Sequence, residues 1–459
     1  MPDFISPNDP KLFGRTDSET IAAAIREACE TGLRKVKIPR YNARTGKNEW
    51  RISRAIALPD EFTVLLDNCY MVQETGCYDR MFCNSRAEDF PHSPETEQHD
   101  IAVIGEGNVI LDGGEHNHLT ERNAERFGMP PIRFNNMFCW INVRGLRVEN
   151  VHIRNQRWWA MNHYWCSDVV LKNINFFADP HVPNMDGIDL RIGCHDFTIE
   201  NITGRTGDDL VAFTAIATEK IAPRMHGKDR DIHDCTLRNL KGDPWIASLF
   251  RLLNQDGSRI YNITADTVMD AAPFTNKKRS SCAIWLGSTL YYRERPARPE
   301  EMHHVTVKNV TSKGQRAVYL QGTSAGVTIE NLHTYSDILS LVASAGPDAE
   351  PYEVRDLRIR HAYHAPGVTP NNLSGFIGRQ AGKSTVCDLT GLTGSILLED
   401  VHSDNAGLKG QGTAVRVSEK ELKAEFKDAE FRNIAKLCAA PAGCGISLNG
   451  RRITGEEAE

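Results

Sequence analysis

The sequence predicts an all-β solenoid of parallel strands, and three observations support this. A short run of alternating apolar residues, ending in Asn or Asp and one more apolar residue, recurs along the chain. Most steps between neighbouring copies fall between 22 and 33 residues. Only one stretch has a helical pattern. A repeat of this length, made of strands, indicates coils that bury their inward side chains against the next coil. The Asn or Asp positions are 150, 173, 201, 234, 262, 309, 331, 356 and 400.

The helical stretch comes first, at residues 17–30. It begins near Asp17 or Ser18, and its apolar residues recur at helical spacing. A solenoid needs a cover over its first coil. We therefore expect an N-terminal capping helix within residues 12–35. The expected apolar face consists of Ile21, Ala24, Ile25 and Ala28.

The regular coils are expected over residues 100–410, after early strands near 36–39 and 62–66. Two charged insertions interrupt them, at 115–135 and 288–302. Residues 410–459 are more irregular, as in a C-terminal cap and tail. Because a solenoid is one elongated stack of coils, we predict a single domain over residues 1–459.

Successive coils should also align one Asn per turn. Neighbouring strands lie about 4.8 Å apart, so residues one repeat apart sit above each other. A column of Asn side chains can then form a ladder in which each amide bonds the next.

Composition narrows the class of function. The chain has 459 residues, of which 40% are hydrophobic and 25% charged, and a net charge of −6. No basic cluster is long enough to follow a nucleic acid, and no run is long enough to span a membrane. Twelve cysteines occur singly without a C-x-x-C pair, and no signal peptide is visible at the N-terminus. These features predict a cytoplasmic protein and leave the oligomeric state open.

Three carboxylates dominate the stretch 183–214. They belong to an Asn-Met-Asp-Gly motif at 184–187 and a Gly-Asp-Asp motif at 207–209. Either motif alone is typical of a turn. Together they place Asp186 and Asp208 one coil apart, with Asp209 alongside, so we expect all three to project into one groove.

Further candidate contacts flank these acids. Three tryptophans occur within residues 158–165, and Trp159 is the best candidate for a platform under a sugar ring. Arg251, one coil beyond Asp208, could bind an anionic or hydroxyl-rich substrate, although a solvated charge explains it equally well. Residues 84–99 hold several His and Glu. A metal site is conceivable there, but a solvated loop is the stronger interpretation.

Hydrolysis of a glycosidic bond requires a protonated carboxyl for the leaving oxygen and an ionised carboxylate for water or direct attack. Packed acids supply both states because their pKa values diverge. The same acids could bind a divalent cation, as in a metal-dependent polysaccharide lyase. No lysine lies between residues 173 and 219 to serve as a base, which weakens that alternative.

The two carboxylate motifs resemble those of glycoside hydrolase family 28, the polygalacturonases. Trp159 to Asn162, followed by Cys166, is similar to a Trp-x-x-His motif of that family. The resemblance covers roughly residues 12–335. It implies a right-handed parallel β-helix that cleaves pectic oligosaccharides, with no cofactor or metal. It further implies single-displacement inversion, with Asp208 as general acid and Asp186 and Asp209 activating water.

The resemblance also suggests substrate-binding residues. Asn184 would hold the sugar or Asp186, and Asn162 stands at the position of the motif's histidine. The family's Gly-His-Gly position corresponds to Gly242-Asp243-Pro244, which makes Asp243 a candidate contact. Its Arg-Ile-Lys position falls near residues 283–286, which carry neither cation. Arg191, Arg251, Arg293 or Arg295 could replace these cations, or the sugar could be neutral.

The favoured hypothesis is therefore an exo-acting glycoside hydrolase whose two insertions close one end of the groove. The first alternative is a non-catalytic carbohydrate-binding β-helix, and the second is the metal-dependent lyase. The expected partner in each case is an oligosaccharide or polysaccharide.

Overall fold

The computed structural model divides the chain into two compact units. The first contains residues 1–210 and 219–235, and the second contains residues 211–218 and 236–459. Within the part of the chain that the structure describes, no helix is long and apolar enough to cross a membrane. The described residues are 3–115, 136–156, 158–179, 184–216, 221–273, 280–287, 295, 297–335, 339–344, 350–366, 384–408 and 410–454.

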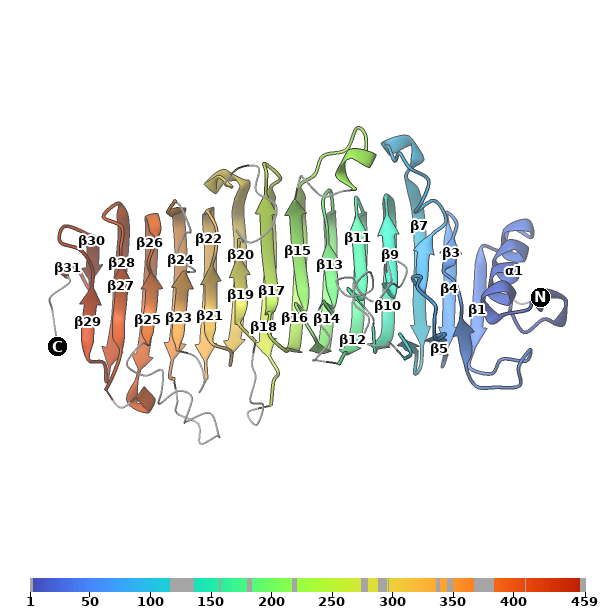
Figure 1. Ribbon diagram of the computed structural model, residues 1–459, viewed down its shortest axis with the longest axis horizontal. Coiled ribbons are helices and arrows are strands. Elements are labelled where there is room, and N and C mark those ends of the chain that lie inside the picture. Colours follow the sequence, from blue (N-terminus) through green and yellow to red (C-terminus); the bar gives the residue numbers. More distant parts are fainter. Residues whose placement is uncertain are drawn as a thin grey trace. The chain divides into compact units, whose positions relative to one another are not determined.

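The predicted capping helix is present as α1 (Asp17–Glu30) in the first unit. The side chain of Thr16 caps it by accepting a hydrogen bond of 3.2 Å from the amide of Glu19. The four residues predicted as its apolar face are all buried. The helix packs on the first strands, β1 (Lys35–Pro39), β2 (Trp50–Ile52) and β3 (Ile56–Leu58) (Figure 1).

Strands of the first unit form two parallel sheets, which confirms the predicted right-handed parallel β-helix. Successive coils contribute one strand to each sheet, so neighbours in a sheet are separated by a full turn of chain. The first sheet contains β1, β2, β4 (Phe62–Asp67), β5 (Tyr70–Gln73), β7 (Gln98–Glu106), β8 (Ile110–Asp112), β10 (Val143–Arg154), β12 (Ser167–Phe177) and β14 (His195–Thr206), and the second contains β3, β6 (Phe82–Asn84), β9 (Phe138–Ile141), β11 (Met161–Tyr164) and β13 (Ile188–Leu190).

The second unit repeats this two-sheet arrangement, and β16 (Ile232–Pro244) begins in the first unit. One sheet contains β16, β18 (Ile260–Asp270), β20 (Met302–Ser312), β22 (Ser324–Thr334), β24 (Tyr352–His364), β26 (Leu392–Asp404), β28 (Leu422–Arg432), β30 (Gly445–Leu448) and β31 (Arg451–Arg452). The other contains β15 (Val211–Ile216), β17 (Ser248–Gln255), β19 (Cys282–Leu286), β21 (Arg316–Leu320), β23 (Ser340–Ser344), β25 (Thr385–Leu389), β27 (Thr413–Val417) and β29 (Lys436–Ala439). Short 3-10 helices occur at Pro10–Leu12, Pro94–Thr96, Ala222–Arg224, Pro299–Glu301 and Ala406–Leu408.

The interior of the first unit lies between its two sheets. His163 on β11 meets Phe197 on β14 edge to face, with ring centroids 5.5 Å apart, so His163 points inward across the core. Side chains alternate along a strand. Asn162 and Tyr164, on either side of His163, therefore lie on the outer face of the second sheet. The register places Asn162 beside Cys139 of β9 and Asp189 of β13.

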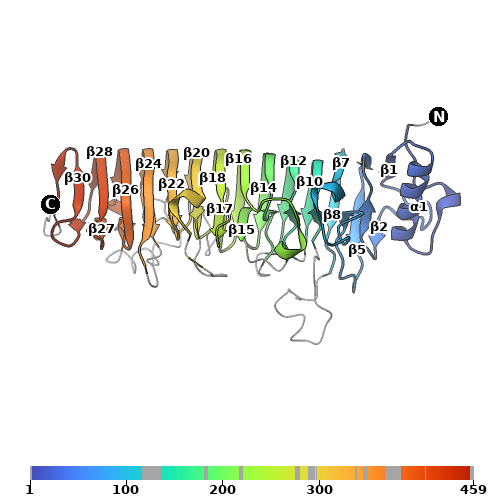
Figure 2. The same cartoon turned by 90° about the horizontal axis from the view of Figure 1, so that it is seen from above.

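The predicted Asn ladder is present on the first sheet, whose strands β10, β12 and β14 lie side by side (Figure 2). The amide of Asn173 donates to Asn150, and that of Asn201 donates to Asn173, each at 2.8 Å. All three residues have φ between 55° and 59°. Asn tolerates this left-handed conformation better than most residues, so one side chain provides both the turn and the ladder.

Three of the nine repeat positions were assigned to the wrong column. In the first unit, Asp234 lies in the column of Asp196, since the neighbouring rings of His195 and His233 stack at 4.8 Å. In the second unit, the register places Asn262 beside His304 and Asp356 beside Gly326, not in the Asn309 column. Most of the described long strands contain positions with positive φ in both columns, such as Asp196 and Asn201 on β14. Asn and Asp suit both, so sequence spacing alone could not separate them.

Candidate active site

The structure brings together the three carboxylates singled out in the sequence. Asp186 precedes β13, and Asp208 and Asp209 follow β14. Backbone bonds from Gly187 to Asp209 (2.9 Å) and from Ile188 to Leu210 (3.0 Å) place Asp186 beside Asp209 on adjacent coils. One carboxylate oxygen from each of the three aspartates lies within 4.8 Å of the others. The spacing of 22 residues is therefore one coil.

The three carboxylates differ in exposure. Asp209 is 1% exposed and Asp186 is 5% exposed, whereas Asp208 is only half-buried. The amide of Asp209 donates to Oδ1 of Asp208 at 3.1 Å, and the hydroxyl of Thr206 donates to the Asp208 carbonyl at 2.7 Å. These bonds fix the turn. Asp208 is consequently the best placed of the three to touch a substrate from outside.

Glycine is required beside Asp186 because the two coils approach closely. A Cβ at Gly187 would lie 2.4 Å from the carbonyl oxygen of Leu210 and 3.0 Å from the ring of Phe176. The Leu210 carbonyl is backbone and cannot move without shifting its coil. The glycine of the Asn-Met-Asp-Gly motif therefore sets the separation of Asp186 and Asp209.

Two buried amides that the sequence analysis missed support this region. Asn136 donates to the carbonyl of Trp159 at 2.6 Å, and Gln156 donates to that of Asp186 at 3.5 Å. Their side-chain oxygens are buried and have no hydrogen-bond partner among the described residues. Neither residue occupies a repeat position. The only sequence signal was a polar residue close to the aromatic cluster.

The aromatic cluster separates into one partly exposed ring and two buried rings. Trp165 is 1% exposed and donates to the carbonyl of Asp229 at 3.2 Å, so it belongs to the protein interior. Trp158 is also buried. Trp159 is half-buried, with its ring 4.7 Å from that of Trp158 and 4.4 Å from the guanidinium carbon of Arg191. The platform role of Trp159 stays a prediction.

Two predicted polar contacts are positioned near these residues. Asn184 has a φ of 60°, and its Oδ1 is buried without a hydrogen-bond partner among the residues described. Asn162 is 1% exposed, and its amide donates to the hydroxyl of Tyr164 at 3.5 Å. Asn162 is thus less accessible than a direct substrate contact needs, while Asn184 has an acceptor oxygen to offer. Both roles stay predictions.

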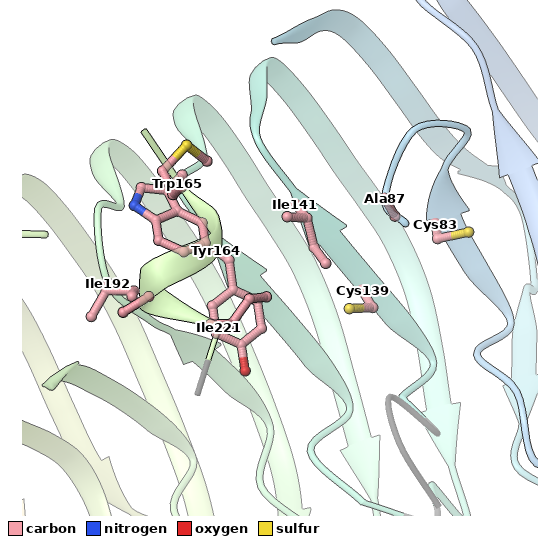
Figure 3. Close-up of a cluster of buried hydrophobic side chains, with 10 residues drawn as sticks. Cys83, Ala87, Cys139, Ile141, Tyr164, Trp165, Ile192 and Ile221 are labelled. Carbon is pink, nitrogen blue, oxygen red and sulfur yellow. The ribbon is translucent and has the colours of Figure 1, made fainter. Parts of the chain in front are cut away.

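A segment far along the chain covers the outer face of the second sheet in the first unit. Ile221, Ala222 and Met225 pack on a row of outward side chains (Figure 3). Backbone bonds between His92 and the segment, to Arg224 at 2.8 Å and from His226 at 2.9 Å, hold it in place. The covered side chains are Cys83 of β6, Cys139 and Ile141 of β9, and Tyr164 of β11.

This contact corrects the interpretation of residues 84–99 as a solvated loop at His92, whereas Glu95 is exposed as expected. His92 is 1% exposed, and its ring packs edge-on against Phe90 with centroids 4.6 Å apart. Burial lowers the pKa of His92. This contact could not be predicted from local sequence, because its partner lies more than a hundred residues later.

The remaining candidates belong to the second unit. Arg251 on β17 is half-buried, with its guanidinium carbon 4.5 Å from the ring of Trp285. Asp243 on β16 is 8% exposed. Arg295 forms an ion pair with Glu301. Arg293, residues 116–135 of the first predicted insertion and residues 288–294 and 296 of the second lie outside the described residues.

The aspartate cluster is also the one group of three among the described residues that could hold a metal ion. Hard cations such as calcium prefer oxygen ligands of this type. The cluster is therefore compatible with acid–base chemistry and with cation binding.

Comparison with known proteins supports the resemblance found in the sequence. Residues 99–223 match the model of the glycosyl hydrolases family 28, and this stretch contains all three aspartates. No curated protein sequence matches the chain. The family match therefore covers about a quarter of the chain, including its carboxylate motifs.

Solved structures with the same fold are available over nearly the whole chain. A family 28 exopolygalacturonase from Yersinia enterocolitica is 12% identical, covers 98% of this chain and 78% of its own, and superposes with a TM-score of 0.52. An exopolygalacturonase from Thermotoga maritima is 16% identical to this chain. The superposition covers 87% of this chain and 92% of the exopolygalacturonase, with a TM-score of 0.55. A mutant tailspike protein of E. coli bacteriophage HK620, in complex with a pentasaccharide, is 12% identical to this chain. The superposition covers 97% of this chain and 80% of the tailspike chain, with a TM-score of 0.59.

Proposed function

We propose that this chain is a glycoside hydrolase that cleaves α-linked galacturonides or related sugars from pectic oligosaccharides. The observation that carries the proposal is the cluster of Asp186, Asp208 and Asp209, with oxygens within 4.8 Å, inside the stretch that matches family 28. Glycoside hydrolysis needs one protonated and one ionised carboxyl at the scissile bond. The three adjacent carboxyls are close enough to fill both roles at one glycosidic bond.

The exposure of each carboxylate supports its role. Asp208 is the most accessible of the three, so it serves as the general acid for the leaving-group oxygen. Its Oδ1 accepts a hydrogen bond from the backbone amide of Asp209. We therefore assign the proton that passes to the leaving group to Oδ2. The buried Asp186 and Asp209 hold and activate the attacking water. Asn184 then binds the sugar through its amide.

One distance favours a second stereochemical course. Inverting enzymes usually separate their two carboxyls by about 6.5–9.5 Å to fit a water, whereas retaining enzymes use about 5–5.5 Å. The nearest oxygens here lie within 4.8 Å, which by itself favours a covalent intermediate. We nevertheless propose inversion, because the family resemblance implies it and a third carboxylate allows two of them to share the water.

Exo-action is supported by the covered outer face in the first unit. Met225 and its neighbours lie over the outward side chains of β6 and β9. A saccharide chain cannot continue over these strands without displacing them. A substrate that extends from Asp208 over these strands would meet this cover, which favours release of sugars from a chain end. These covering residues are not those of the two insertions expected from sequence.

A reducing, cytoplasmic location is part of the proposal. It is supported by the twelve cysteines, of which eleven are buried, where a thiol packs as a small apolar group. Such a location suits an exo-acting enzyme on imported oligosaccharides.

The deciding experiment follows a panel of pectic oligosaccharides and α-galactosides by real-time proton NMR. Release of a β-anomer from an α-linked substrate supports inverting hydrolysis, and first appearance of the α-anomer supports retention. An unsaturated, ultraviolet-absorbing product that disappears with a chelator would instead support the lyase. Binding without any product, in a folded protein, would favour the non-catalytic alternative.

A further inference from the structure

A cavity in the second unit is not used by the proposed active site. It has a volume of about 280 Å³ and lies on strands β21, β23 and β25. Val318, Val342 and Cys387 on these strands are buried and share one register column. The neighbouring column, which borders the cavity, therefore lies on the outer face. The lining residues are Gln315, Arg316, Tyr319, Leu339, Ser340, Ala343, Ser344, Ser384, Thr385 and Asp388.

The cavity exists because a small residue stands between two larger ones. The register places Tyr319 beside Ala343, and Ala343 beside Asp388. Adjacent strands lie about 4.8 Å apart, so the backbones of Tyr319 and Asp388 are roughly 10 Å apart. Only the methyl group of Ala343 fills the interval. The result is a slot one strand wide, with an aromatic ring on one side and a carboxylate on the other.

The aromatic side of the slot is firmly supported. Tyr319 is half-buried, its ring centroid lies 5.1 Å from that of Trp285, and the guanidinium carbon of Arg316 lies 4.2 Å from it. The indole nitrogen of Trp285 donates to Gln321 at 3.0 Å. Neighbouring side chains thus fix the Tyr319 ring before a ligand arrives, which reduces the entropy lost on binding.

The polar side of the slot presents oriented hydrogen-bonding groups. Asp388 accepts a hydrogen bond of 2.6 Å from the Thr390 hydroxyl and one of 3.3 Å from Arg416. Thr385 is 2% exposed, and its hydroxyl oxygen has no hydrogen-bond partner among the described residues. A buried hydroxyl without a partner is unfavourable. Asp388 is only half-buried and is the group that a ligand hydroxyl in the slot can reach.

We propose that this slot is a second, non-catalytic binding site for one pyranose residue of an acidic saccharide. The sugar ring packs against Tyr319, and its hydroxyls bond to Asp388. Its carboxylate pairs with Arg316, because guanidinium groups bind carboxylates in a defined, often bidentate geometry. The choice of an acidic sugar rests on the proposed function. Such a site would retain a polymeric or oligomeric substrate on the protein between cleavage events.

The test uses the full-length chain carrying Asp208→Asn, so that turnover does not consume the probe. Trigalacturonate is titrated by calorimetry. Tyr319→Ala is expected to weaken one binding event by at least about tenfold, equivalent to about 1.4 kcal/mol. Ala343→Phe, which fills the slot and keeps Tyr319, should have the same effect. Tyr363→Ala on β24 is the matched control, since Tyr363 is 45% exposed and outside the cavity.

The charge assignment has its own comparison. Arg316→Gln should weaken trigalacturonate by about fivefold or more and leave its methyl ester almost unaffected, because only the acid can form the ion pair. Equal loss for both ligands would overturn the carboxylate assignment.

The outcomes separate this proposal from the proposed function. Turnover by the unmodified chain, with trigalacturonate binding that neither Tyr319→Ala nor Ala343→Phe alters, overturns the second site alone. Absence of turnover, with binding that both substitutions weaken, overturns the hydrolase proposal and leaves the second site supported.

Discussion

The two sheets of the first unit show how this fold separates stability from chemistry. In the first sheet, β10, β12 and β14 contain 11 or 12 residues each and carry the unbroken Asn ladder. In the second, β9, β11 and β13 contain only three or four residues. Asp186 and Trp159 lie just before the short strands β13 and β11, and Asp208 and Asp209 follow the long strand β14. Long regular strands hold the coils in register. Beside the short strands, more of the backbone lies outside the regular pairing and can orient side chains toward a substrate.

If this division is correct, substitutions beside the short strands should affect catalysis more than stability, and substitutions in the ladder should do the reverse.

Replacing the accessible carboxylate should have the largest effect. Asp208→Asn is expected to lower kcat by about 10³-fold, because general acid catalysis contributes roughly 10²–10⁴-fold. The free energy of unfolding should be nearly unchanged, since Asp208 is only half-buried and Asn has almost the same size. Steady-state kinetics and urea unfolding measure the two effects. The matched control is Asp196→Asn, at an exposed position on β14, and a variant at Asp208 with near-normal kcat would refute the assignment.

Gly187→Ala should affect catalysis and stability together, because this glycine sets the coil separation at the carboxylates. Its Cβ would meet the Leu210 carbonyl at 2.4 Å. We expect about 100-fold lower activity, since misplacing a catalytic group by about 1 Å can cost that much. Unfolding free energy should fall by about 1–3 kcal/mol. At Gly445, where the nearest atom to a Cβ is the Leu422 carbonyl oxygen at 3.3 Å, the same substitution should have a much smaller effect in both measurements.

The histidine buried between the two sheets of the first unit, His163, should make stability depend on pH. Burial lowers the pKa of His163 to about 4, below its usual value of about 6.5 in the unfolded chain. The unfolded chain therefore binds the proton first. The stabilisation is complete above pH 6.5 and declines by about 3 kcal/mol as the pH falls to 4.

Urea unfolding at several pH values checks this, and His163→Leu should flatten most of the decline. Residual pH dependence is expected from His92, whose pKa is also lowered by burial. Substitution of the exposed His152 on β10 provides the control. An unchanged pH profile in His163→Leu would mean that other groups determine acid stability.

The same contrast explains what sequence could and could not predict. The helix α1, the alternating strands and the ladder of Asn150, Asn173 and Asn201 follow a period, so spacing was enough. The carboxylate cluster was predictable because its 22-residue separation equals one coil. The supports at Asn136 and Gln156 have no period.

The covering contact between Met225 and the strands β6 and β9 depends on residues far apart in the chain. Local propensity carries no information about such pairing. The two positive-φ columns were confused for a related reason. Both impose the same backbone conformation, and Asn262 satisfies one as readily as Asn309 satisfies the other.

The smallest predicted effect concerns the ladder itself and completes the contrast. Asn173→Ala removes one donated and one accepted hydrogen bond of 2.8 Å and places Ala at a φ of 55°. Because the site is exposed, we expect a loss of about 1–2 kcal/mol in unfolding free energy and no change in kcat.

Asn173→Gly separates the causes, since glycine accepts positive φ without steric cost but makes no ladder bond. If Gly restores part of the stability, backbone conformation contributes that part. If the two variants lose the same unfolding free energy, the loss comes mainly from the ladder hydrogen bonds. A fall in kcat in either variant would show that the long strands also position the carboxylates, and the separation of roles between the sheets would fail.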